Sequence, residues 1–527
     1  MFKHLLLLCF AAHVTLSSAQ TLHAQDTATL PEMATIEAAW QAKDYDTVRA
    51  GLEILATQTD EPRTHYRYGR VLFEGLGGPV DIDGGVKWFE RAAAENNTDA
   101  LMVLAKVYLT NFTEQDVSTS LTRNPERAAE LLSLAAALGE AKAQFELGRL
   151  YRAGLGLPAD PRKAFQWFLA AANQENPEAQ FALAQAYSQG LGAEKNSDKT
   201  VAWLTRAADN NHTQAQFALA AAYEAGNGVE QSPARAADWY RRAAEGGSPL
   251  GQRKLGLAYL TGNGAPQDPR EAVMWLTRAA QAGDAVAMNH LGQAYASGET
   301  LEQSDETAAL WYSRAAQYDL GSAVVSLAAM TETGRGVAQD FDAAIALYQK
   351  AITLKGGENA VLRLGQLAAS GALGDRFAPG RVVPWVRAAW VTGDADSESW
   401  LVDQAKGGLR DAQMALAETL LADPARVADG MPYLHQAANG GDPLAQFQLG
   451  QRLMTGDGVD LDYIAAHAWF NIAATLGETD ATALRDTVTT LMTPDDVAQA
   501  QTRARDWFAN EEPQPPATDQ TVKVISE

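Results

Sequence analysis

The segment AQFELGRLYRAGLGLPADPRKAFQWFLAAA, from Ala143 to Ala172, contains the pattern that decides the fold. In its first half, Phe145, Leu147 and Tyr151 recur at the spacing of one face of an α-helix. Its second half carries another stripe of this kind: Ala164, Trp167, Phe168 and Ala171. The two stripes predict two amphipathic helices joined by a turn.

Glycine and proline mark the turn between these two helices. Gly154 stands three residues after Tyr151, where a helix end requires a left-handed conformation that glycine adopts easily. Pro158 breaks the chain, and Asp160 with Pro161 then forms a typical N-cap and first position of the next helix. The segment therefore predicts a helix-turn-helix unit.

The unit recurs in strict register. One tyrosine marks each first helix at a period of 36 residues: Tyr151, Tyr187, Tyr223, Tyr259 and Tyr295. One tryptophan marks each second helix at the same period: Trp167, Trp203, Trp239, Trp275 and Trp311. A single hairpin is too small to bury its apolar face, so the copies must stack into a solenoid. We expect the tryptophans to fill the space between layers.

Weaker copies extend the array to residues 64–479, giving ten or eleven copies in total. An insertion of seven residues falls in the turn at 110–124, where Asn111 takes the glycine position and is expected to be a left-handed cap. The segment 357–410 is irregular and has two interpretations. Either Gly371 ends a first helix and Trp385 begins a second, or Trp390 to Trp400 forms one copy with a shortened turn.

The ends of the chain differ from the array. Residues 31–63 and 480–509 are expected to form capping helices, and residues 510–527 a disordered tail. Residues 1–19 resemble a signal peptide, with Lys3 before a short apolar run and cleavage after Ala19 or, alternatively, Ala24. Such a peptide would send the mature chain to the periplasm or outside the cell. Because the single cysteine, Cys9, lies in the apolar run, the mature chain would carry no disulfide.

On these residues the chain resembles the SEL-one-like repeat (SLR) family, a branch of the tetratricopeptide-like helical repeats. The family pattern matches best at Ala215–Val229 with Ala236–Ala244, and at Leu255–Gly264 with Glu271–Ala280. The ending Leu491–Asp495 is also similar to the terminus of bacterial members. The resemblance implies an all-α, right-handed superhelical solenoid whose inner surface binds a protein or peptide.

Composition limits the classes of partner. The formal net charge is −23, and a surface this acidic repels phosphate backbones, which argues against nucleic acid as a partner. The acidity suits either plain solubility or contact with basic patches on another protein. No later stretch reaches the apolar length of a membrane helix, so no stable membrane insertion is expected.

Residues for catalysis or for cofactor binding are not evident. The recurring pairs such as Gly154 and Gly156 lack the third glycine and the preceding strand of a dinucleotide site, and they lack the Gly-Lys-Ser/Thr ending of a phosphate loop. None of the five histidines from His65 onward has a second histidine or a cysteine at ligand spacing. We therefore expect no cofactor, no metal and no enzymatic activity.

Two groups of residues are candidates for partner binding. Four glutamines occupy one repeat position and could form a polar ladder on the inner face, or could hydrogen-bond between repeats: Gln144, Gln180, Gln216 and Gln252. Asn111 and Phe112 begin the insertion, and long loops in tight arrays often carry contacts. The function expected is a non-catalytic scaffold or adaptor, with a regulator of envelope signalling or of exopolysaccharide assembly as the alternative.

Overall fold

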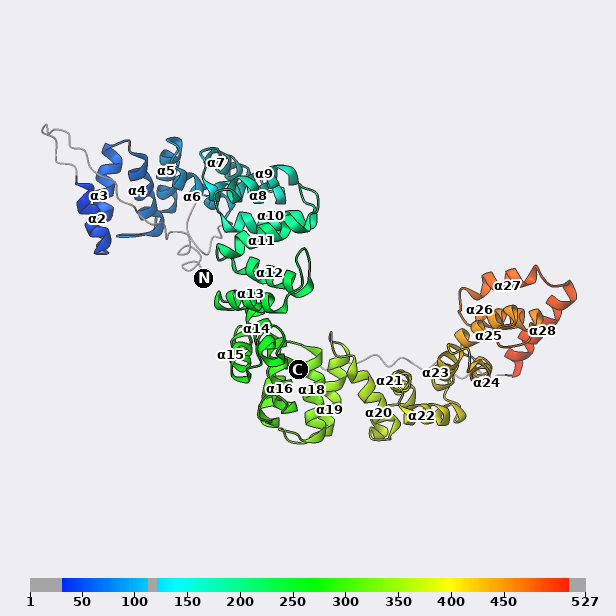
Figure 1. Ribbon diagram of the computed structural model, residues 1–527. Coiled ribbons are helices and arrows are strands. Elements are labelled where there is room, and N and C mark those ends of the chain that lie inside the picture. Colours follow the sequence, from blue (N-terminus) through cyan, green and yellow to red (C-terminus); the bar gives the residue numbers. More distant parts are fainter. Residues whose placement is uncertain (1–30, 112–120, 511–527) are drawn as a thin grey trace, which may run out of the picture. The chain divides into compact units, whose positions relative to one another are not determined.

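The computed structural model describes residues 31–111 and 121–510 (Figure 1). The predicted signal peptide, Phe112, most of the insertion and nearly all of the predicted tail lie outside the described residues. Within the described part the regular elements are α-helices and one short 3₁₀ helix, without strands. This confirms the prediction of an all-α fold built from helix-turn-helix units.

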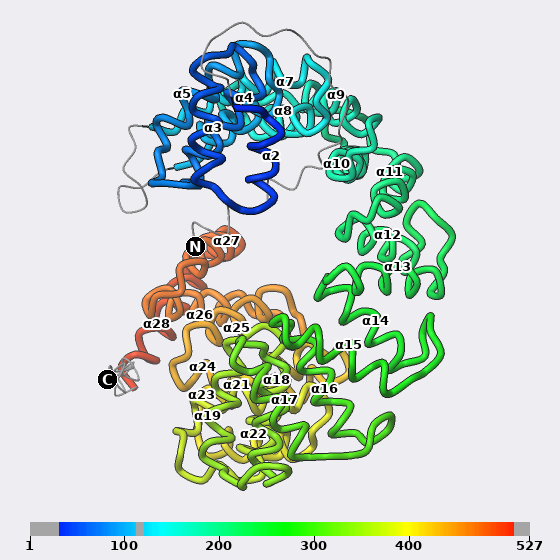
Figure 2. The backbone as a smooth tube through the Cα atoms, turned by 90° about the vertical axis from the view of Figure 1, so that its left-hand side faces the viewer, coloured from blue at the N-terminus to red at the C-terminus, as the bar shows by residue number. Residues whose placement is uncertain are grey.

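The chain divides into two compact units, the first ending at Asp284 and the second beginning at Ala285. Unit one contains α2 (Met33–Gln41), α3 (Tyr45–Gln58), α4 (Pro62–Glu74), α5 (Ile82–Ala94), α6 (Thr98–Leu109), α7 (Pro125–Ala137), α8 (Ala141–Ala153), α9 (Pro161–Ala172), α10 (Pro177–Gln189), α11 (Ser197–Asp209), α12 (Thr213–Ala225), α13 (Pro233–Glu245), α14 (Pro249–Thr261) and α15 (Pro269–Gln281). From α4 to α15, each even-numbered first helix packs against the second helix that follows it, and each second helix packs against the next first helix (Figures 1 and 2).

Unit two continues with α16 (Ala285–Ser297), α17 (Asp305–Ala316), α18 (Gly321–Thr333), α19 (Phe341–Ile352), α20 (Asn359–Ala369), η1 (Gly374–Arg376), α21 (Pro379–Val391), α22 (Ala395–Lys406), α23 (Arg410–Leu421), α24 (Val427–Asn439), α25 (Pro443–Thr455), α26 (Tyr463–Thr475), α27 (Ala481–Thr489) and α28 (Pro494–Asn510). Most of these helices form hairpins like those of unit one. The last two both pack on α26. Among the described residues, none of the helices has the length and apolar character needed to cross a membrane.

The turn chemistry predicted from the sequence is confirmed in the repeat that contains it. Gly154 ends α8 in the left-handed conformation, with φ 66°. Asp160 caps α9 by accepting hydrogen bonds from the backbone N–H groups of Arg162 and Lys163, and Pro161 is the first residue of the helix. These local signals fix where each helix ends because they satisfy backbone groups that the helix itself leaves free.

The second glycine of each turn has a different role, which is to allow close approach between layers. A Cβ atom on Gly156 would lie 2.0 Å from the carbonyl oxygen of Pro125, at the start of the preceding second helix. The equivalent Gly192 would place its Cβ 2.1 Å from the oxygen of Pro161. A side chain at this position would therefore push adjacent layers apart.

Two glycines of one turn allow this role to be tested. Gly190 and Gly192 both have φ 78°, but the nearest atom to a Cβ on Gly190 would be in the flexible side chain of Lys195, at 3.1 Å, and the nearest backbone atom would be at 3.8 Å. Gly190→Ala should cost about 1–2 kcal/mol for the left-handed backbone. Gly192→Ala should cost about 2–4 kcal/mol, because a backbone clash is added. Equilibrium urea unfolding measures both, and equal losses would contradict the close-approach explanation.

The tryptophans lie between layers, as expected, but they are not the most deeply buried residues of the second helices. The tryptophans are half-buried in most repeats, and Trp275, with 6% exposed, is an exception. The buried side chain is the residue one step further along, which follows the tryptophan or, in one repeat, Leu347: Phe89, Phe168, Leu204, Tyr240, Leu276, Tyr312, Tyr348 and Phe470. One step along a helix rotates a side chain by about 100°. Trp203 consequently lies at the seam between two layers, in contact with the apolar clusters of both.

The irregular segment of unit two contains one helix outside the hairpin alternation. α20 and α21 pack together as a hairpin, with Trp385 in α21, which corresponds to the first of the two interpretations. α22 then packs on both α21 and α23. Short links precede and follow it, with Gly393 at φ 102° and Gly408 at φ 90°, like the link at Gly247 (φ 85°) between ordinary repeats. α22 therefore occupies the place of a first helix relative to α21. Relative to α23, it occupies the place of a second helix.

Candidate interaction surface

A row of half-buried apolar side chains runs along the first helices of unit one. The same repeat position carries Tyr66 in α4, Met102 in α6, Phe145 in α8, Phe181 in α10 and Phe217 in α12. Each of the four aromatic rings contacts a ring of the same repeat: Tyr66 with Phe89, Phe145 with Phe168, Phe181 with His212 and Phe217 with Tyr240. We call these five residues, with the exposed residues beside them on the same helices, the first-helix face.

Charged groups lie beside this row. On α8, Lys142, Arg149 and Arg152 are exposed, and Arg149 forms an ion pair with Glu146 at 2.9 Å. The row stops at α14, where the equivalent residue is Arg253, which pairs with Asp284 at 2.9 Å. The face therefore combines aromatic rings with arginines, two kinds of residue that protein interfaces favour.

The four predicted glutamines belong to the contacts between layers. Gln144, Gln180 and Gln216 are buried, and Gln252 is half-buried. Each side-chain amide donates a hydrogen bond to the carbonyl oxygen at the end of the preceding second helix, eight residues earlier in the chain, at 3.1–3.3 Å. The acceptors are Ala136, Ala172, Ala208 and Ala244. This geometry accounts for the glutamines by hydrogen bonding between repeats, the alternative that the sequence left open.

The oxygen atoms of two of these glutamines are also used. Gln174 donates to Gln144 Oε1 at 2.9 Å, and Asn210 donates to Gln180 Oε1 at 3.0 Å. Both donors lie at the end of the second helix of the same repeat. Each of these two glutamines therefore joins the preceding layer to its own layer, which leaves little of its side chain for a partner.

Two equivalent glutamines escaped the sequence analysis. Gln413 donates to the carbonyl oxygen of Ala405 at 3.1 Å, and Gln446 donates to that of Ala438 at 2.9 Å. Their signal was the Ala-Gln pair at the start of a first helix, the same dipeptide that begins AQF at Ala143. Because Ala405 belongs to α22, the bond from Gln413 to Ala405 also shows that α22 takes the place of the second helix that precedes α23.

Asn111 does not have the conformation expected of it. α6 ends at Leu109 with Thr110 as an extended C-cap, at φ −80° and ψ 140°, and Asn111 is not among the described residues with positive φ. The expected left-handed cap is therefore wrong, because the chain leaves this helix in an extended conformation. Asn111 is exposed and lies far along the chain from the glutamines, while Phe112 lies outside the described residues.

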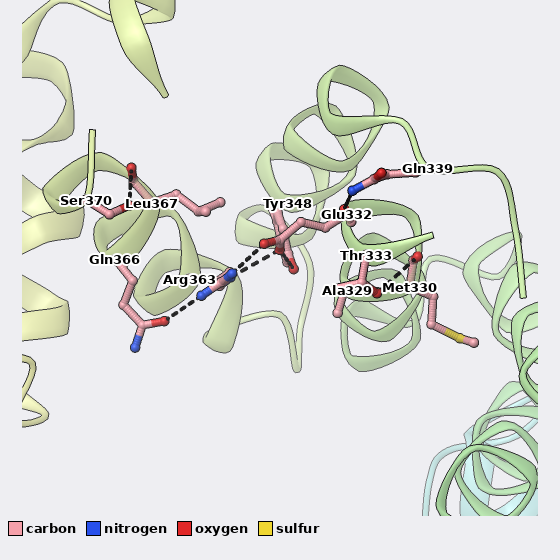
Figure 3. Close-up of polar contacts among 10 residues, drawn as sticks. All are labelled: Ala329, Met330, Glu332, Thr333, Gln339, Tyr348, Arg363, Gln366, Leu367 and Ser370. Carbon is pink, nitrogen blue, oxygen red and sulfur yellow. Dashed lines mark hydrogen bonds and ion pairs between the residues drawn. The ribbon is translucent and has the colours of Figure 1, made fainter. Parts of the chain in front are cut away.

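Two carboxylates form polar clamps between layers at equivalent positions. Glu224, on α12, accepts a hydrogen bond from the hydroxyl of Tyr240 at 2.6 Å and forms an ion pair with Lys254 at 2.9 Å. Three repeats later, Glu332 accepts from the Tyr348 hydroxyl at 2.9 Å and pairs with Arg363 (Figure 3). In each clamp the tyrosine lies on the second helix of the same repeat and the cation on the next first helix.

The electrostatics of these clamps keep the groups in their ordinary charge states. Burial by itself would raise the pKa of Glu332, but hydrogen bonds from Arg363 and Tyr348 and the charge of Arg363 bring the pKa below its usual value of 4.5. Burial, and then the hydrogen bond to Glu332, raise the pKa of Tyr348. The carboxylate stays ionised and the phenol stays protonated near neutral pH. The arrangement therefore stabilises the stack and offers no group poised for proton transfer.

The clamp can be tested with a matched pair of tyrosines. Tyr348→Phe removes the hydroxyl that donates to a carboxylate, and should cost about 1.5–3 kcal/mol. Tyr312→Phe changes the equivalent residue of the preceding repeat, where Ala296 replaces the glutamate and the hydroxyl faces Ser326. It should cost about 0.5–1.5 kcal/mol. Urea unfolding of both variants is the measurement, and a larger loss from Tyr312→Phe would refute the clamp.

Histidines and acidic residues do not gather into a metal site in the described part of the chain. His65 is buried beside Trp88 and bonds the carbonyl oxygen of Thr59 at 2.9 Å. His212 caps α12 by accepting from the backbone N–H of Ala215 at 3.1 Å. These two histidines therefore have structural roles.

Comparison with known protein families gives the assignment. The Sel1 repeat matches nine segments, which together span more than half of the chain: residues 62–97, 118–140, 141–176, 177–212, 213–248, 249–284, 285–319, 315–355 and 443–478. The chain belongs to the Sel1 repeat family. Proteins built from Sel1 repeats are typically helical, non-catalytic scaffolds for protein interaction. The irregular segment around α22 lies between the matched segments, in agreement with its departure from the repeat.

One of two similar solved structures shows the same fold. A protective antigen of uropathogenic Escherichia coli with an SLR fold is 26% identical, with a TM-score of 0.59, over 90% of this chain and 94% of its own. A Sel1 repeat protein from Oxalobacter formigenes is 29% identical, with a TM-score of 0.46, over 67% of this chain and 97% of its own. No curated protein sequence matches this one significantly.

Proposed function

We propose that this Sel1 repeat protein is an exported, non-catalytic scaffold that holds a protein or peptide partner on the first-helix face of unit one. Membership of a family of helical interaction scaffolds supports the general role. The observation that carries the specific proposal is the row from Tyr66 to Phe217, which places five large apolar side chains, all half-buried, on successive first helices.

The physical argument is that these side chains retain apolar surface in contact with water. Covering such surface is favourable by about 25 cal/mol per Å². Aromatic residues and arginine contribute disproportionately to binding energy at interfaces. The nearby cations, such as Lys142 and Arg149, would fix the orientation of a partner through its charges. The side-chain amides of the buried glutamines, by contrast, are already hydrogen-bonded within the stack.

Site-specific photo-crosslinking in the native cell tests the surface. A photoreactive phenylalanine derivative at Phe181 or Phe217 should give a discrete protein adduct. The same residue at Ala137, an exposed position on the second helix α7, is the matched control and should give little adduct. Gel mobility and mass spectrometry identify the adduct. Equal labelling at all three positions, or none at either phenylalanine, would contradict the proposal.

Export rests on the N-terminal sequence alone and has its own test. If the signal peptide is cleaved after Ala19, the mature protein should begin at Gln20, and cleavage after Ala24 would give Gln25. Mass spectrometry of the N-terminal peptide, together with cell fractionation, distinguishes the two. A mature protein that retains Lys3 and remains in the cytoplasm would show that it is not exported.

A further inference from the structure

Unit one contains a region whose charge departs from that of the whole chain. Residues 141–284 carry fifteen lysines and arginines and fourteen aspartates and glutamates, while the complete chain has a net charge of −23. The excess acidity therefore lies elsewhere in the chain. Within this region nine of the cations lie on the second helices α9, α11, α13 and α15, while others, such as Arg149 and Arg152, lie on first helices.

Between residues 141 and 284, three arginines occupy the same repeat position, each stacked on a tryptophan, and Arg91 and Arg314 repeat the arrangement outside this region. Arg206 lies 4.7 Å from the ring centre of Trp203, Arg242 lies 4.2 Å from that of Trp239, and Arg278 lies 4.7 Å from that of Trp275. In each pair the arginine follows the tryptophan by three residues, so the two side chains share one side of the helix. All three arginines are exposed.

Two further cations extend this arrangement at the start of the helices. Lys199 lies over Tyr187 at 5.2 Å, and Arg235 lies over Tyr223 at 5.6 Å. Lys199 precedes Trp203 by four residues, as Arg235 precedes Trp239, so they lie on the same side of the helix as the arginine pairs. We call the following five residues the cationic stripe: Lys199, Arg206, Arg235, Arg242 and Arg278.

The way these cations are held leaves their charge available. A cation–π contact fixes a guanidinium over a ring without neutralising it, whereas an ion pair would cancel its charge. Within the described residues, Arg206 and Arg278 have no carboxylate partner. Arg242 has Asp209 at 3.8 Å, with 56% and 60% of the two side chains exposed, which is a weak surface pair. Within the described residues, Arg242 is therefore the one member of the stripe with a carboxylate partner, and the other four cations keep an unneutralised charge.

We propose that the cationic stripe on α11, α13 and α15 binds a short acidic segment of a polypeptide partner. Planar guanidinium groups match carboxylates with two parallel hydrogen bonds, and the half-buried Trp203 and Trp239 can cover apolar atoms of the same segment. The segment must be short, because the rest of the chain is strongly acidic and would repel a polyanion that extends beyond these three helices. This inference rests on the proposed scaffold function and adds a second contact of stated chemistry to it.

The test uses the full chain and a fluorescein-labelled peptide of twelve glutamates, with twelve glutamines as the uncharged control. Fluorescence anisotropy at low salt should show binding of the glutamate peptide alone, and binding should weaken as salt is added. The variant Arg206→Gln, Arg242→Gln, Arg278→Gln should lose affinity on the order of tenfold or more. Absence of glutamate-peptide binding to the wild type would overturn the proposal.

A matched control separates the stripe from net charge. Lys43→Gln, Lys87→Gln, Lys355→Gln removes the same number of charges from exposed lysines that have no carboxylate partner within the described residues. It should leave the affinity within about twofold of the wild type. An equal loss in both triple variants would refute a specific site. If the arginine variant unfolds, the single variants R206Q and R278Q, each expected to lose about threefold in affinity, carry the test.

Ligands other than an acidic polypeptide would give different results in these experiments. A uronate oligosaccharide that binds the wild type more tightly than the glutamate peptide, and is lost in the arginine variant, would overturn the polypeptide assignment. Self-association seen by light scattering and abolished in that variant would assign the stripe to a second copy of this chain and would likewise overturn it.

The outcomes also separate this inference from the proposed function. Crosslinks at Phe181 that persist while the wild type fails to bind the acidic peptide would refute the stripe and leave the scaffold role intact. Peptide binding without any crosslink at Phe181 or Phe217 would refute the first-helix face instead.

Discussion

Close approach between neighbouring layers is the constraint on which the array depends. A single hairpin cannot bury its apolar face, so the second glycine of the turn brings each layer against the start of the preceding second helix, as Gly192 does at Pro161. Alanines such as Ala143, Ala171 and Ala207 are completely buried where the helices meet. Large side chains therefore concentrate at the few positions where a layer has room. The 36-residue period follows because every repeat uses the same packing of one layer on the next.

Packing this close leaves the ends of helices buried, and their backbone carbonyl groups need partners. The glutamines supply them, since each amide reaches a carbonyl oxygen of the preceding second helix, as Gln216 does at Ala208. The clamps at Glu224 and Glu332 add charge-assisted bonds across the same boundaries. The polar residues of the interior thus fix the register of one layer on the next, while the apolar residues provide the driving force.

The repeat positions that are not fully buried by the packing of the layers give unit one two surfaces with different chemistry. The first helices carry the row from Tyr66 to Phe217, whose rings are half covered by their own repeats. The second helices carry arginines over tryptophans, as at Arg242 and Trp239, where the ring positions the charge without cancelling it. The charged residues of both surfaces are exposed and can vary in chemistry without loss of the stack, whereas the tryptophans also belong to the contacts between layers.

The sequence by itself determined the helix pairs, their ends and their period. Signals such as Gly154, Asp160 and Pro161 act on backbone groups within a few residues, and local effects are visible in a single sequence. The tertiary structure alone decided that Tyr240, not Trp239, is the buried aromatic residue, that the glutamines are spent between layers, and that α22 stands outside the hairpins. These outcomes depend on which atoms of the neighbouring layer lie opposite, and helical spacing assigns a residue to one side of a helix without saying what covers it.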